Sequence, residues 1–91
     1  MAIARIQLII SGKVQGVAYR FSAKREADQL SLTGWVQNRA NGDVEIMAEG
    51  HQTQLNQFIK WAQTGPKFAD VHGIVIKNLK ASNEFKQFNI R

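Results

Sequence analysis

The order of structural elements is decided by the stretch IARIQLIISGKVQGVAYR, residues 3–20. In its first part, up to about residue 11, apolar side chains alternate with the polar Arg5 and Gln7, which is typical of a strand with one buried face. Two glycines, Gly12 and Gly16, then punctuate a short loop, and a helical spacing of apolar residues follows. The stretch therefore predicts a strand, a glycine loop and a helix.

The rest of the chain continues this alternation of strands and helices. The pattern predicts a helix over about 21–30, a strand over 33–38, a turn at 40–43, a strand over 44–49, a helix over 52–64 and strands over 71–79 and 85–90. The order βαββαβ with a terminal strand is typical of an α+β, ferredoxin-like split βαβ sandwich, in which two helices cover one face of an antiparallel sheet. We expect residues 1–91 to form a single domain.

Composition restricts the classes of function. The chain carries 12 Lys and Arg against 7 Asp and Glu, a net charge of +5, which favours an anionic partner. It has no cysteine, which excludes disulfides, thiolate catalysis and cysteine-ligated metals. Residues 1–5 lack the pattern of a signal peptide, and no apolar run is long enough to span a membrane. We expect a cytoplasmic protein without membrane contact, and no metal site, because His51 and His72 are isolated.

The loop between the first strand and the first helix has the properties of a phosphate site. Glycines let backbone N–H groups approach an anion, and a helix N-terminus adds free N–H groups. Arg20, Lys24 and Arg25 follow the loop, where cations are disfavoured unless an anion is bound. The alternative is a common glycine loop followed by solvated surface charges. The G-x-x-x-x-G-K-[ST] order of nucleotide-binding P-loops is missing.

Asn38 ends the second predicted strand, although asparagine is disfavoured within strands. Its side chain could open the turn that follows by bonding to nearby backbone. Alternatively, its amide could point into the glycine loop. Both arrangements are compatible with a split βαβ fold.

Residues 10–20 closely resemble the phosphate-binding signature of the acylphosphatases. A second signature of that family is matched by Gly34, Trp35, Val36, Gln37, Asn38, Gly42, Val44 and Gly50. Gly65-Pro66, followed by Ala69 and Val71, echoes a later family pattern, so the resemblance covers essentially the whole chain. Tyr19 stands where the family usually has Phe, and Ala18 occupies a position that is often glycine.

The resemblance implies hydrolysis of the carboxyl–phosphate bond of acyl phosphates by direct attack of water. Arg20 would bind the phosphoryl group together with loop amides, and Asn38 would orient the water. The amides implied by the resemblance are those of Gln15, Gly16, Val17, Ala18 and Tyr19. No metal or cofactor is implied, and we expect a monomer acting on a small molecule.

Several residues have a simpler interpretation. Trp35 and Trp61 are expected to pack or to lie on the surface, and Glu45 and Glu49 to be solvated rather than a catalytic pair. A buried Tyr19 hydroxyl would need a hydrogen-bond partner.

The alternatives to an enzyme are non-catalytic modules of the same fold that bind anions or RNA. The aromatic stacking motif of RNA-recognition domains is absent from the strand over 44–49, so no specific nucleic acid is expected. A recognition domain of a larger maturation protein is disfavoured by the length of 91 residues.

Overall fold

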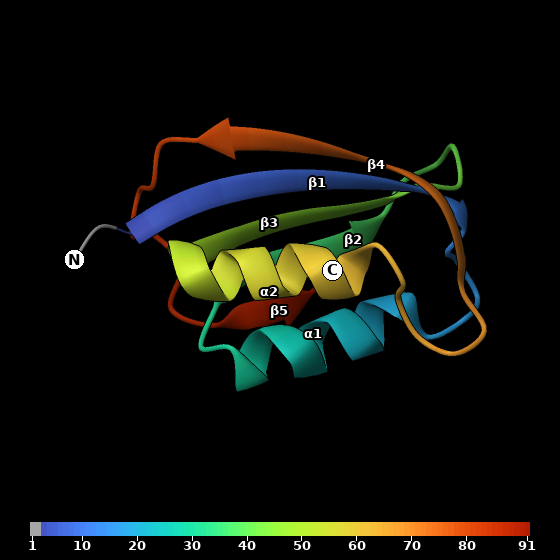
Figure 1. Ribbon diagram of the computed structural model, residues 1–91, viewed down its shortest axis with the longest axis horizontal. Helices are drawn as coiled ribbons and strands as arrows, with labels where there is room; N and C mark the ends of the chain where they lie inside the picture. Colours follow the sequence, from blue (N-terminus) through green and yellow to red (C-terminus); the bar gives the residue numbers. More distant parts are fainter. Residues whose placement is uncertain (1–2) are drawn as a thin grey trace.

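The computed structural model describes residues 3–91. Met1 and Ala2, the first two of the five residues in which no signal-peptide pattern was found, lie outside the described residues. The elements, shown in Figure 1, are β1 (Ile3–Lys13), α1 (Tyr19–Gln29), β2 (Thr33–Asn38), β3 (Val44–His51), α2 (Gln52–Ala62), β4 (Asp70–Leu79) and β5 (Phe88–Ile90). All seven predicted elements are present. Half of their boundaries agree with the prediction, and the others differ from it by one to three residues.

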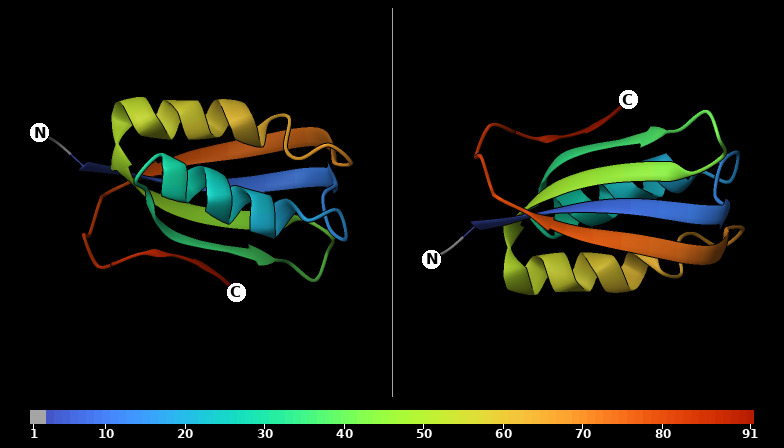
Figure 2. Two further views of the ribbon diagram at one scale, coloured as in Figure 1. Left: turned by 90° about the horizontal axis from the view of Figure 1, so that it is seen from below. Right: turned by 90° about the horizontal axis from the view of Figure 1, so that it is seen from above.

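The strands form one sheet in the order β4-β1-β3-β2-β5. The pairs β1–β3, β1–β4 and β2–β3 are antiparallel, as expected. The pair β2–β5 is parallel, so the expectation of a wholly antiparallel sheet was wrong for this edge. The reason is the last connection, which carries the chain from β4 at one edge to β5 at the other (Figure 2). The ferredoxin-like α+β arrangement is confirmed.

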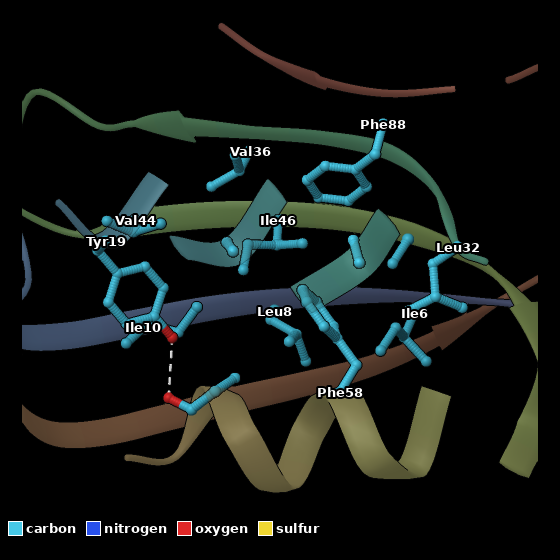
Figure 3. Close-up of a cluster of buried hydrophobic side chains, with 14 of the residues drawn as sticks. Ile6, Leu8, Ile10, Tyr19, Leu32, Val36, Val44, Ile46, Phe58 and Phe88 are labelled. Carbon is cyan, nitrogen blue, oxygen red and sulfur yellow. Dashed lines mark hydrogen bonds between the residues drawn. The ribbon is translucent and has the colours of Figure 1, made fainter. Parts of the chain in front are cut away.

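Both helices pack on the same face of the sheet (Figures 1 and 2). The alternation in β1 buries Ile6, Leu8 and Ile10 completely, and the helical spacing in α2 buries Leu55 and Phe58. Figure 3 shows these strand side chains meeting Phe58 between the layers. Neither helix in the described part of the chain is long and apolar enough to cross a membrane.

The predicted strand over 85–90 is shorter than expected, because β5 begins only at Phe88. The residues before it form a crossover that is held by side chains of the sheet. The guanidinium of Arg5 lies 4.8 Å from the centre of the Phe85 ring and also donates to the Glu84 carboxylate. Arg5 of β1 thus holds this segment at Glu84 and Phe85, and the first backbone bond to β2 comes from Gly34 N to Gln87 O at 3.0 Å.

Glu49 was expected to be solvated, and this prediction was wrong: its side chain is only 2% exposed. Its carboxylate accepts hydrogen bonds from the backbone N–H groups of Ser82 and Asn83, each at 2.9 Å, and pairs with Arg5. Burial favours the neutral acid, but these hydrogen bonds outweigh it and hold the pKa of Glu49 below its ordinary value. Glu45 is half-buried and accepts hydrogen bonds from Gln7 and Gln37.

Candidate active site

The connection from β1 to α1 spans residues 14–18 and turns through two left-handed backbone positions. Gly16 has a φ of 75°, and Ala18, the N-cap of α1, has a φ of 63°. The left-handed conformation is unstrained for glycine and disfavoured for alanine. Gly12 allows β1 and β4 to approach each other closely, because a Cβ atom on residue 12 would lie 2.3 Å from the carbonyl oxygen of Asp70 in β4.

The loop leaves a series of backbone N–H groups without protein acceptors. Within residues 3–91, the N–H groups of residues 15–18 donate to no other backbone oxygen, and the first bond of α1 runs from Ser22 N to Ala18 O at 3.0 Å. The first turn of α1 contains no acidic side chain. The region is therefore a concentration of free donors at the positive end of a helix dipole.

A cavity of about 200 Å³ lies against this loop. It joins the loop and the first turn of α1 to the ends of β2 and β5, and its lining residues are Val14, Gly16, Ala18, Tyr19, Arg20, Phe21, Asn38 and Ile90. Arg20 and Asn38, the two residues for which the sequence predicted direct roles, thus share one cavity. Gln15 and Val17 do not line it with their side chains.

Arg20 lies in the first turn of α1 and is half-buried. Its Nη1 donates to the main-chain oxygen of Arg91 at 2.9 Å, which connects the start of α1 to the end of β5. The guanidinium keeps further N–H donors available for an anion in the cavity.

Lys24 and Arg25 were taken together with Arg20 as a sign of a bound anion, but neither lines the cavity. Lys24 lies one turn further along α1, and its Nζ donates to the carboxylate of Asp28 at 3.0 Å and to the carbonyl oxygen of Phe88 at 2.8 Å. Arg25 faces a different hollow. The first turn therefore presents a single cation, Arg20.

Asn38 does not make the turn that follows it. The turn is closed by the backbone pair Arg39 N to Asp43 O at 2.8 Å and by the Asn41 side chain, whose Oδ1 accepts from Asp43 N at 3.1 Å. The exposed Asn38 side chain lines the cavity instead. This placement favours the second of the two interpretations left open by the sequence.

Gln15 has a contact that sequence reasoning missed. Its Nε2 donates to the carbonyl oxygens of Arg39 at 2.8 Å and Asp43 at 2.9 Å. These bonds tie the loop to the β2–β3 turn, and so fix its position relative to Asn38. A long-range contact of this kind leaves no local pattern in the sequence.

Tyr19 is buried, with 1% of its surface exposed, and its hydroxyl donates to the Ala62 carbonyl oxygen at 2.8 Å (Figure 3). Its ring also packs on Trp61, with 5.3 Å between ring centres. Burial raises the pKa of the Tyr19 phenol far above its ordinary value. The Tyr19 hydroxyl is thus neutral and already donates its proton to the Ala62 carbonyl oxygen, so it is not suited to act as a nucleophile.

A second hollow of about 230 Å³ lies between α1 and the end of α2, lined by Ser22, Arg25, Glu26, Gln29, Trp61 and Pro66. Although it is larger, it contains no free loop amides, and the carboxylate of Glu26 disfavours an anion there. In residues 3–91, no group of three or more His, Cys, Asp and Glu side chains is placed to hold a metal ion. The cavity at Arg20 is therefore the better candidate.

Comparison with known proteins adds independent information. Residues 6–90 match the family model described as Acylphosphatase. A curated acylphosphatase of Marinobacter nauticus is 47% identical over 97% of this chain and 96% of its own length. The crystal structure of acylphosphatase from Bacillus subtilis superimposes with a TM-score of 0.93 at 35% identity, covering 97% of this chain and 98% of that one. The crystal structure of full-length HypF in the phosphate- and nucleotide-bound form contains a similar region, with a TM-score of 0.87 and 26% sequence identity. The match covers 99% of this chain and 12% of the HypF chain.

Proposed function

Because the chain belongs to the acylphosphatase family and is an acylphosphatase enzyme, we propose that it hydrolyses acyl phosphates by direct attack of water on phosphorus. The products are a carboxylate and inorganic phosphate. The observation that carries this proposal is the shared cavity, which brings Arg20 and Asn38 together beside the free amides of the loop.

Arg20 and the loop amides bind the phosphoryl group. The N–H groups of residues 15–18 donate to no other backbone oxygen within residues 3–91, so phosphate oxygens can accept from them. Arg20 adds a planar, permanently charged donor in the same cavity, and arginine binds phosphate through paired hydrogen bonds. These contacts hold the substrate and also stabilise the charge that develops on the phosphoryl oxygens.

Asn38 orients the attacking water. Its amide is neutral, so it positions the water through hydrogen bonds and does not act as a strong base. The water oxygen forms a bond to phosphorus while the bond from phosphorus to the acyl oxygen breaks, and the carboxylate leaves with the electron pair. The substrate phosphate accepts the proton of the water. A mixed anhydride has a good leaving group, so positioning and charge stabilisation are sufficient.

The substrate of the proposed reaction is a small molecule, and the residues proposed to act on it, Arg20 and Asn38, share one cavity. We expect the protein to act as a monomer. The absence of cysteine is compatible with a reducing compartment such as the cytoplasm.

The test compares two substrates. The purified protein should release phosphate from benzoyl phosphate but not from p-nitrophenyl phosphate, because the lining offers no free nucleophile and no carboxylate, histidine or cysteine side chain to activate a poor leaving group. The Arg20→Ala variant, purified in the same way, controls for contaminating phosphatases. Comparable turnover of both substrates by the wild type would contradict the proposal.

The position of attack is tested with water labelled with oxygen-18. Attack on phosphorus places the label in the released phosphate, whereas attack on carbon places it in the carboxylate. A label in the carboxylate would show that water attacks carbon, which would overturn the proposed attack on phosphorus but not the proposed hydrolysis of acyl phosphates. Activity should also survive a chelator, since no step uses a metal.

A further inference from the structure

Two large apolar side chains are exposed beside the active-site cavity. Among the exposed large hydrophobic residues within 3–91, Phe21 is 58% exposed and Ile90 is 41% exposed. Both line the cavity that contains Arg20 and Asn38, and none of the other large exposed apolar residues does. Phe21 also has no aromatic or cation–π partner in residues 3–91. Its ring is therefore available to a ligand.

The burial of the lining residues distinguishes the floor of the cavity from its mouth. Val14 and Tyr19 are each 1% exposed and belong to the floor, whereas Phe21 and Ile90 are open to solvent. In the proposed reaction, phosphate oxygens are bound by the loop amides and Arg20. The acyl group, on the other side of the broken bond, then extends toward the open mouth.

The two apolar residues come from elements that pack against each other. Phe21 lies in the first turn of α1, which contacts β5. Ile90 pairs with Val36, whose side chain is buried on the helix-covered face, so Ile90 faces the same side of the sheet. The bond from Arg20 to the Arg91 oxygen holds α1 and the end of β5 together at this point.

We propose that Phe21 and Ile90 form an apolar rim that contacts the acyl group and selects acyl phosphates with a large apolar acyl group, such as benzoyl phosphate. This inference rests on the proposed function, and it names the substrate class for the same site. Contact between an aromatic acyl group and these side chains removes apolar surface from water, which acetyl phosphate can do only slightly. The single charge in the lining, Arg20, is already engaged by the phosphoryl group.

The experiment measures kcat/KM for benzoyl phosphate and for acetyl phosphate with the wild type, Phe21→Ala and Phe68→Ala. Phe68 is 71% exposed and lies outside the cavity, so it is a matched control for loss of an exposed ring. We expect the preference of the wild type for benzoyl phosphate to fall by about five- to thirtyfold in Phe21→Ala, the range for loss of one side chain's apolar contact. The preference should be unchanged in Phe68→Ala.

A binding measurement tests the rim without catalysis. Benzoylphosphonate and acetylphosphonate are non-hydrolysable analogues, and their Kd values by calorimetry should show the same preference and the same loss in Phe21→Ala. Orthophosphate has no acyl group, so its Kd reports only on the phosphate cradle.

The outcomes separate the two proposals. An unchanged preference in Phe21→Ala, or an equal loss in Phe68→Ala, would overturn the apolar rim while hydrolysis itself stands. A wild type that hydrolyses neither acyl phosphate would overturn the proposed function. Equal affinity of the wild type for both phosphonates would also overturn the rim.

Discussion

The phenol oxygen of Tyr19 donates to the carbonyl oxygen of Ala62 at 2.8 Å, and so joins the first residue of α1 to the last residue of α2. The carbonyl groups at the end of a helix have no intrahelical donor, so the bond satisfies a group that would otherwise be unpaired. The contact is buried in the core between the two helices and the sheet (Figure 3). Tyrosine at this position thus fastens the two helices together at the end of the molecule where catalysis is proposed.

The Tyr19→Phe variant should therefore lose stability but remain an enzyme. Removing the hydroxyl leaves the buried Ala62 carbonyl unpaired, which costs about 1–2 kcal/mol in the free energy of unfolding. The measurement is urea denaturation followed by circular dichroism. Because burial keeps the phenol neutral, hydrolysis of benzoyl phosphate should persist, and a trapped phosphotyrosine in the wild type would contradict this role.

Glu49 provides a prediction on pH dependence. Its pKa in the folded state lies below the ordinary value of 4.5, so its stabilising contribution is present above that pH and is lost as the pH falls through the folded pKa. Glu49→Gln should lower the free energy of unfolding by about 2–3 kcal/mol near neutral pH, because hydrogen bonds to a buried charge are lost. The difference in the free energy of unfolding between Glu49→Gln and the wild type should become smaller when unfolding is measured at a pH below 4.5, the ordinary pKa of the group.

Glu84→Gln is the matched control for this measurement. Glu84 also pairs with Arg5, but its side chain is 60% exposed. Solvent screens such a pair, so the loss of stability should be much smaller. Equal losses in the two variants would show that Arg5, and not the burial of Glu49, determines the effect.

The sequence predicted the parts of the fold that depend on local periodicity. The alternation in β1 and the spacing of Leu55 and Phe58 in α2 identified the buried faces, because a period of two or of 3.6 directly places side chains on one side. The pairing of β2 with β5 was missed, since the direction of a late strand depends on a long connection and not on its own residues.

The errors at the level of side chains have the same origin. Glu49 lies on the open face by its alternation, and that pattern predicts solvation; it is buried because residues 82 and 83, distant in the sequence, cover it. Lys24 was counted, from its position alone, among the cations that indicated a bound anion, but its Nζ donates to the carbonyl oxygen of Phe88 in β5. Arg20 and Asn38 could be predicted as site residues because they belong to the family signatures, whereas Phe21 and Ile90 lie outside the motif positions quoted from the sequence.

Ala18 allows a test of backbone strain in the loop. Its φ of 63° costs alanine about 1–2 kcal/mol relative to a right-handed conformation, whereas glycine adopts it freely. After subtracting the larger entropy that glycine loses on folding, Ala18→Gly should stabilise the protein by about 0.5–1 kcal/mol. Ser31→Gly, at a φ of 58° outside the cavity, should show a similar gain in thermal unfolding. A loss of stability in both variants would show that these positions are not strained.

The different roles proposed for Arg20 and Asn38, phosphate binding and orientation of the attacking water, are tested by measuring ligand affinity and turnover separately. Arg20→Ala should lose both orthophosphate affinity and kcat/KM, because the cation contacts the phosphoryl group in the ground state and in the transition state. Asn38→Ala should keep orthophosphate affinity while kcat falls by about a hundredfold, as expected when a positioned polar group is removed. Calorimetry and steady-state kinetics give the two quantities.

The control for Asn38 is Asn41→Ala. Asn41 makes the side-chain bond of the β2–β3 turn and does not line the cavity, so its loss should lower stability with little effect on kcat. If Asn38→Ala behaves in this way instead, its amide supports the turn and the water must be oriented by another group. If Asn38→Ala and Arg20→Ala lose orthophosphate affinity equally, Asn38 is a phosphate ligand and the assignment of the water to it is wrong.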